Sequence, residues 1–307
     1  MISRFFSKSK PIHSIIIIVL ICLVFFYVRS QYILEHLLTL EALKQLGVLL
    51  VAVFSVFVLD FIIGKNSLTQ KNSYTILIYG LFIALVPNSL SNTSILLANV
   101  FILFALRRLI SLHSKLSIKK KFFDATFWIA MASLCYFWAI LFFALIPVAL
   151  LYYSQNDIKN WMVPFVTLIG VAIIVVAFNI LVYDNFLSDL LITPSISFDF
   201  SNYNAIAFIV AFTMIFTILM WTLVFYIKLI REVKGKLKPS YVLIGTSVLV
   251  ALAIIIVSPL KIGSEFLFLF APLAIIMTNY LERISDLRFK EVLLALLMIT
   301  PIVVLLL

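Results

Sequence analysis

Long apolar runs recur along the chain, and short polar segments separate them. A helix that crosses a bilayer needs about 20 consecutive apolar residues, within a range of about 17–25. Clear runs of this kind cover 12–28, 46–63, 161–181, 206–227, 240–258 and 292–307. More interrupted runs cover 74–86, 94–110 and 265–279. The pattern predicts an all-α fold, a polytopic bundle of transmembrane helices.

The apolar run 125–153 is longer than one span needs, and it has two interpretations. It forms either one long tilted helix or a hairpin of two legs of about 14 residues. Each such leg rises only about 21 Å, which is short of a hydrocarbon core of about 30 Å. A hairpin of this size is therefore expected to be re-entrant or buried among other helices, with Tyr136, Phe137 and Trp138 near its tip.

The distribution of lysine and arginine favours the hairpin. If the N-terminus is inside and 125–153 enters and leaves on one side, 20 of the 23 basic residues fall inside and 3 fall outside. If 125–153 crosses once, the split becomes 12 inside and 11 outside. Cytoplasmic loops of membrane proteins carry an excess of lysine and arginine. We therefore predict about eleven membrane segments, including a short hairpin at 125–153, with the N-terminus inside.

The composition agrees with a membrane protein. Apolar residues make up 64% of the chain, charged residues make up 12%, and the mean hydropathy is +1.22. A soluble domain carries about twice this share of charged residues, so the soluble globular class is excluded. No polar segment approaches the roughly 50 residues that a soluble domain needs. The sequence thus predicts a single integral membrane domain over 1–307.

The net charge of +10 comes largely from basic strips at 107–121 and 228–238, which lie in predicted inside loops. We interpret these strips as topology determinants that also attract anionic lipid headgroups. No basic run is interleaved with aromatic residues on a polar surface, so no nucleic-acid partner is expected.

Candidate chemistry within the predicted spans is sparse. Asp60, Asn99 and Asn179 are the residues that hint at a polar cavity, so a flippase or transporter is kept as an alternative. Asparagines in apolar runs usually donate hydrogen bonds to a neighbouring helix. Cys22 and Cys135 have no metal-ligand spacing, and no histidine pair has one either, so no metal or other cofactor is expected.

Three basic residues fall on the predicted outside face, against the charge bias. Arg29 shares a loop with Glu35 and Glu41, and Lys261 lies near Glu265. One interpretation is a site for a phosphate or another anion, with a carboxylate as base or metal ligand. The other is that Arg29, Lys44 and Lys261 are snorkelling cations beside compensating acids.

Three short segments carry a resemblance to a known family: MISRFFSKSKP at 1–11, ALRRLIS at 105–111 and FDA at 123–125. They are similar to an uncharacterised family of multi-pass inner-membrane proteins of Bacteroidota, and the similarity extends along most of the chain. The resemblance implies a protein of the bacterial inner membrane and cell envelope, with the lipid bilayer and other envelope membrane proteins as partners. Since no catalytic constellation is visible, we expect a non-enzymatic structural or accessory component.

The region 74–153 combines a short-legged helix pair, an Arg-Arg terminus, a basic loop and a hairpin with an aromatic tip. It looks like part of a polytopic GT-C-type glycosyltransferase, although the large extracytoplasmic domain of that class is missing. The resemblance implies a polyprenyl-phosphate-linked substrate and an acidic residue in the first outer loop. That loop holds Glu35 and Glu41, which become the catalytic candidates, and Arg29 and Lys261 become the phosphate-binding candidates.

Overall fold

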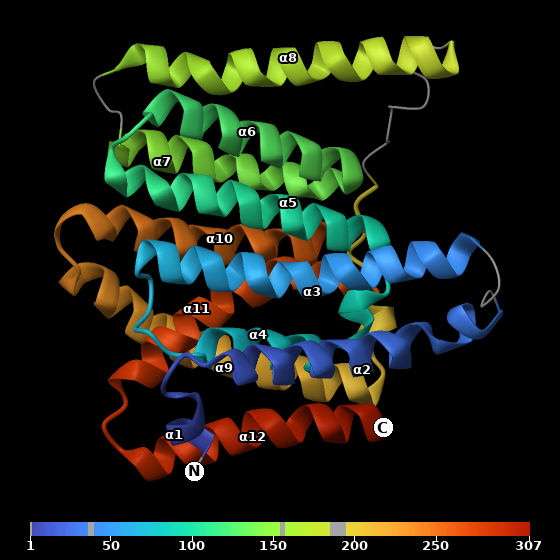
Figure 1. Cartoon of the computed structure of the whole chain (residues 1–307), viewed down its shortest axis with the longest axis vertical. Helices are drawn as coiled ribbons and strands as arrows, with labels where there is room; N and C mark the ends of the chain where they lie inside the picture. The colour runs from blue at the N-terminus through green and yellow to red at the C-terminus, as the bar shows by residue number, and fades with distance from the viewer. Residues whose placement is uncertain (1, 36–39, 154–156, 185–194) are drawn as a thin grey trace.

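A computed structural model describes residues 2–35, 40–153, 157–184 and 195–307, which form helices joined by turns and loops (Figure 1). Eight helices in this part of the chain are long and apolar enough to cross a membrane. They are α2 (Pro11–Glu35), α3 (Leu40–Asn66), α5 (Thr93–Ile110), α8 (Ile158–Tyr183), α9 (Ile206–Glu232), α10 (Lys238–Val257), α11 (Leu267–Arg283) and α12 (Leu287–Leu306). The prediction of an all-helical, multi-pass membrane fold is confirmed, whereas the total of eleven segments stays a prediction.

Four further α-helices complete the described part of the bundle. They are α1 (Ile2–Phe6), α4 (Tyr74–Leu85), α6 (Ile118–Cys135) and α7 (Leu145–Tyr153). Short 3₁₀ turns join several of the helices, including η1 (Pro87–Leu90) between α4 and α5, and η6 (Ser264–Phe266) before α11. Each such turn keeps the backbone hydrogen-bonded where the chain changes direction.

The centre of the bundle is formed by α4 and α11. Every residue of α4 is buried, and residues 264–281, which comprise η6 and most of α11, are all buried. α4 packs against α2, α11 and α12, so protein surrounds it in place of lipid. A helix that is apolar all round and enclosed in this way forms the core of a membrane bundle.

Close approach of α2 to α4 depends on Gly80. A Cβ atom at this position would lie 2.7 Å from Cγ2 of Ile17, which is itself fully buried. Small residues let membrane helices approach closely, because association within lipid depends on van der Waals packing. Gly80 therefore fixes the spacing between these two helices.

A hydrogen-bonded network ties α3, α4 and α5 together inside the bundle. The hydroxyl groups of Ser55 and Tyr79 lie 3.0 Å apart, and Asn99 Nδ2 donates to the Tyr79 hydroxyl oxygen at 3.2 Å. Thr75 on α4 also donates to Thr278 on α11, with 3.0 Å between the two hydroxyl oxygens. The expectation that Asn99 bonds to a neighbouring helix is confirmed.

The segment 125–153 reverses direction at Tyr136. The first leg is α6, and the second is a 3₁₀ helix, η3 (Phe137–Ala144), that continues into α7. The Tyr136 hydroxyl at the tip donates to Ser258 Oγ at 2.9 Å, beyond the last residue of α10. Lys119 and Lys159, which flank the segment, line one cleft at the other end of the bundle. The segment is therefore a hairpin that begins and ends on the same side.

The legs of this hairpin are longer than the sequence indicated. α6 begins at Ile118 rather than at 125, so its 18 residues rise about 27 Å. In the second leg, eight residues are 3₁₀ helix, whose rise of about 2.0 Å per residue stretches the leg to about 29 Å. The predicted leg length was wrong because it excluded the lysine-bearing first turns of α6 and assumed α-helical rise throughout.

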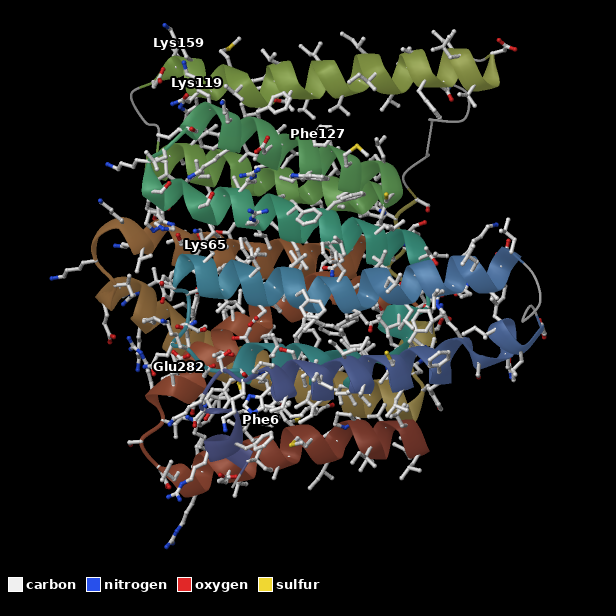
Figure 2. The ribbon with its side chains drawn as sticks, viewed as in Figure 1. Phe6, Lys65, Lys119, Phe127, Lys159 and Glu282 are labelled. Carbon is white, nitrogen blue, oxygen red and sulfur yellow. The ribbon has the colours of Figure 1, made fainter. Side chains whose placement is uncertain are left out.

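The two ends of the bundle differ in charge. Lys65, Lys119 and Lys159 lie at one end, on the left in Figure 2, together with Glu282. We call this the basic end. The loops and helix ends at the other side, called the opposite end, include Arg29, Glu41 and Lys261. Helix α8 packs mainly against α6 and lies along one edge of the bundle, with α12 along the opposite edge (Figure 1).

Candidate functional site

Arg29 lies at the opposite end and is buried on α2. Its Nε donates to the Leu90 carbonyl at 3.0 Å, and its Nη2 donates to the Ser91 carbonyl at 2.7 Å. The same side chain donates to Gln45 Oε1 at 2.6 Å and to Thr93 Oγ1 at 3.1 Å. These bonds connect α2 to α3, to the end of η1 and to the start of α5. They give Arg29 a structural role, and phosphate binding by this residue stays a prediction.

Lys261 follows α10 and is fully buried. Its Nζ donates to the carbonyl oxygens of Ile255, Ile256 and Ser258, at 3.2, 2.6 and 3.1 Å. The ammonium also lies 4.3 Å from the centroid of the Phe200 ring. A cation placed on the last carbonyls of a helix satisfies groups that have no partner within the helix. Lys261 thus caps α10.

Burial lowers the pKa of Lys261 below its ordinary value, and the negative charge of Asp199 opposes this shift. Lys261 does not bond to Glu265, its neighbour in sequence. Glu265 is fully buried and accepts hydrogen bonds from the Tyr203 hydroxyl and, at 3.2 Å, from the Gly263 amide. The sequence suggested a lysine beside a compensating acid, and the structure gives each of them a different set of partners.

Glu35 and Glu41 lie near each other in sequence but on different helices. Glu35 is exposed at the end of α2, and Glu41 is in the first turn of α3. Glu41 accepts from the Tyr32 hydroxyl at 3.1 Å and pairs with Lys44 Nζ at 2.5 Å. Their catalytic role stays a prediction, because nothing in these contacts joins them to Arg29 or Lys261 in one site.

The polar residues that would serve a transporter are dispersed. Asp60 is exposed on α3, Asn99 belongs to the network with Tyr79, and Asn179 is buried on α8. No three histidine, cysteine, aspartate or glutamate side chains gather as a metal-binding group among the described residues. The described part of the chain therefore gives the transporter alternative no shared polar site built from these residues.

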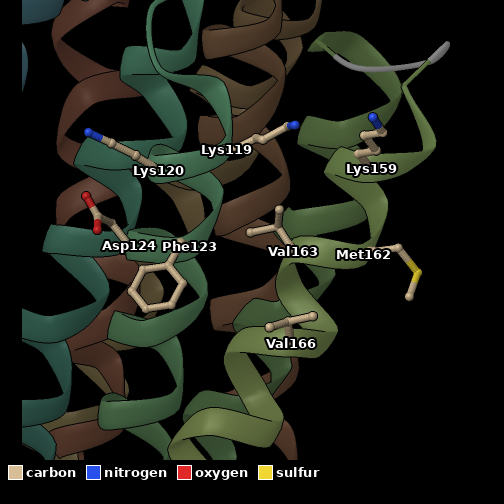
Figure 3. A pocket seen from close by; sticks show the side chains of 8 residues that line it. All are labelled: Lys119, Lys120, Phe123, Asp124, Lys159, Met162, Val163 and Val166. Atoms are coloured by element: carbon tan, nitrogen blue, oxygen red, sulfur yellow. The ribbon is translucent and has the colours of Figure 1, made fainter.

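A cleft of about 460 Å³ lies at the basic end, between α6 and α8 (Figure 3). Its lining combines three lysines with an apolar wall. The lining residues are Lys119, Lys120, Phe123, Asp124, Lys159, Met162, Val163 and Val166. Figure 3 shows Lys119 and Lys159 at the mouth of the cleft, with Phe123, Val163 and Val166 deeper along the two helices.

The lysines of this cleft have no ion-pair partner among the described residues. Asp124, the one acid in the lining, pairs with Arg108 on α5, with 2.9 Å between Oδ2 and Nε. Among the described residues, Lys119, Lys120 and Lys159 form no ion pair. Figure 3 shows the side chains of Lys119 and Lys159 directed toward each other across the cleft, while Lys120 and the paired Asp124 point to the other side of α6. Two ammonium groups at the cleft, with a third on the same turn of α6, favour an anionic ligand.

Local structure fixes where these lysines lie. Lys121 Nζ donates to the Ser111 carbonyl at 2.5 Å and to Ser114 Oγ at 2.7 Å, which ties the first turn of α6 back to the preceding segment. The side chain of Asp157 caps α8 by accepting from the Lys159 amide at 3.1 Å. The turn that carries Lys159 is therefore held at the start of α8.

The sequence identified Lys119 and Lys120 as part of a strip that attracts lipid headgroups, but it did not join them to Lys159. The signal was present in the hairpin prediction, because a hairpin at 125–153 returns the chain to the side from which it left. Residues just before and just after the hairpin can then meet. The apolar wall carried no separate signal, since Val163 and Val166 resemble any other apolar residues of a span.

Comparisons of the chain with known proteins find no matching family model, no matching curated protein and no matching solved structure. The site therefore has to be understood from its own geometry.

Proposed function

We propose that the protein is a multi-pass component of the bacterial inner membrane, with its basic end in the cytoplasm, and that it has a non-enzymatic structural or accessory role in the cell envelope. The observation that carries the orientation is the gathering of Lys65, Lys119 and Lys159 at one end of the bundle. Short cytoplasmic loops of membrane proteins are enriched in lysine and arginine. The accessory role is supported by the bonding of Arg29 and Lys261, which serves helix packing and capping.

The orientation is tested by cysteine labelling in spheroplasts. We replace both native cysteines by serine and introduce either Leu116→Cys at the basic end or Asn204→Cys at the opposite end, both at exposed positions. A membrane-impermeant maleimide is expected to label Asn204→Cys in intact spheroplasts and Leu116→Cys only after permeabilisation. Each cysteine is the control for the other. The reverse pattern would contradict the proposed orientation.

The non-enzymatic role is tested with the two acids that a GT-C-like transferase would need. In a bacterium that encodes the chain, Glu35→Gln and Glu41→Gln are each expected to restore the envelope properties lost on deletion as fully as the wild-type chain does. The physical reason is that Glu35 is exposed at the end of α2 and Glu41 is half-buried in a surface pair with Lys44, so loss of either charge disturbs little of the fold. Restoration is measured by growth under osmotic and detergent stress, with membrane levels checked by immunoblotting. If either variant inserts normally but fails to restore growth, the result contradicts our proposal and supports the transferase alternative.

A further inference from the structure

We propose that the cleft between α6 and α8 binds one anionic glycerophospholipid, with its phosphate between Lys119 and Lys159 and an acyl chain along the apolar wall. The leaflet that supplies this lipid follows from the orientation proposed above, so that part rests on the proposed function. The binding itself rests on the geometry of the cleft.

The charge of the cleft selects an anionic headgroup. Lys119 on α6 and Lys159 on α8 point toward each other across the cleft, so two separate helices supply the ammonium groups, and Lys120 adds positive charge from the other side of α6 (Figure 3). Ammonium groups bind phosphate oxygens as compact point charges. Since Asp124 is paired with Arg108, it does not compensate these lysines fully. A zwitterionic headgroup would bring a second positive charge into the same place and bind less well.

The wall of the cleft selects an amphiphile over a soluble anion. Phe123, Val163 and Val166 continue from the lysines along α6 and α8, away from the basic end (Figure 3). The volume of about 460 Å³ falls within the range of about 300–1,000 Å³ that small-molecule sites occupy. A phosphate joined to an acyl chain satisfies both parts of the lining, whereas inorganic phosphate leaves the apolar part unused.

The position of α8 gives a lipid direct access. This helix packs mainly against α6, and its span is the least buried of the eight. One side of the cleft is therefore bounded by a helix that faces the bilayer over most of its surface. A phospholipid can enter sideways from the leaflet at the basic end, with its headgroup already at the depth of the lysines.

The test uses the full chain in detergent and counts bound lipids by native mass spectrometry. The wild-type chain is expected to retain one phosphatidylglycerol in preference to phosphatidylcholine. Lys119→Gln, Lys120→Gln and Lys159→Gln together are expected to weaken phosphatidylglycerol binding by about tenfold or more. The matched control is Lys234→Gln, Lys236→Gln and Lys238→Gln, which removes the same charge from another strip at the basic end, and a change under about twofold is expected. Equal losses in both triple variants, or no loss in the first, would overturn the proposal.

A second pair of variants tests the apolar wall without changing charge. Val166→Trp places a large ring in the cleft, and Ile169→Trp places the same ring at an exposed position of α8 that does not line it. The first is expected to displace the bound lipid, and the second is expected to leave it in place. Retention in Val166→Trp to the same extent as in Ile169→Trp would contradict acyl-chain binding.

Competition experiments distinguish a phospholipid ligand from inorganic phosphate and from a polyprenyl phosphate. Inorganic phosphate is expected not to displace phosphatidylglycerol at equal concentration, because it cannot use the wall. Binding of a polyprenyl phosphate in the absence of phosphatidylglycerol binding would overturn the proposal in favour of a transferase substrate. Lipid binding is measured in detergent, where the protein has no orientation across a membrane. The lipid-binding result and the cysteine-labelling result can therefore fail independently.

Discussion

The Arg29→Met variant is expected to lose about 3 kcal/mol of stability and to show a correspondingly lower Tm in detergent. Methionine keeps much of the apolar contact of the side chain but removes all of its donors. The carbonyl oxygens of Leu90 and Ser91 then lose a charged partner at the point where η1 ends and α5 begins. Thermal unfolding followed by fluorescence-detected size-exclusion chromatography measures the change.

Lys44→Gln is the matched control for this effect. Lys44 is also a cation at the opposite end, but its side chain is 60% exposed and pairs with Glu41 one helical turn away. Exposed pairs of this kind contribute about 0.2–1 kcal/mol, so little change in Tm is expected. If Arg29→Met unfolds at the same temperature as Lys44→Gln, the bonds of Arg29 do not hold the helices together as described.

Gly263→Ala is expected to cost about 2–4 kcal/mol through two separate effects. The backbone at Gly263 has φ of +96°, which strains a residue with a side chain. The new Cβ would also lie 2.8 Å from the Phe208 ring and 3.2 Å from Val86. The same detergent unfolding assay reports the sum of these costs as a lower Tm.

Two other glycines separate the effects. Gly235 has φ of +76° but no heavy atom within 4 Å of a built Cβ, so Gly235→Ala reports the backbone cost alone. Gly47 lies within α3 with the same open surroundings and no such φ, so Gly47→Ala is expected to stabilise the chain slightly. The contact at Gly263 is absent if Gly263→Ala and Gly235→Ala lower the Tm equally.

The helical class and the path of the hairpin could be predicted because apolar length and charge asymmetry are direct consequences of the bilayer. The sequence could not predict which of the helices would be most buried and which least buried. The least apolar of the eight candidate spans, which contains α11, is the most buried, and α8, among the most apolar, is the least buried. A highly apolar helix in a membrane protein is typically one that contacts lipid. An enclosed helix such as α11 can instead carry polar residues, because the side chains of Thr278 and Asn279 donate hydrogen bonds to backbone carbonyls of the same helix.

The candidate site, like the fold, could be predicted from the sequence only in part. The sequence predicted that Arg29 and Lys261 lie on the side where cations are rare, which made them candidates for a site. It could not show their partners, since the acceptors are carbonyl oxygens of Ser91, Ile256 and neighbouring residues, and every residue has such an oxygen. Lys159 was not predicted as a site residue, because it contributes to the cleft only when α8 lies beside α6.

The burial of α4 has a consequence for how the protein is made. Translation delivers α4 together with α3 and α5, so the Ser55–Tyr79–Asn99 bonds can form early. Its 12 residues rise only about 18 Å, too short to cross the hydrocarbon core alone. The face of α4 that meets α11 and α12 has no protein neighbour until the ribosome has added the last two helices of the described chain. The surroundings of α4 at the centre of the bundle are therefore completed only after α11 and α12 have been synthesised.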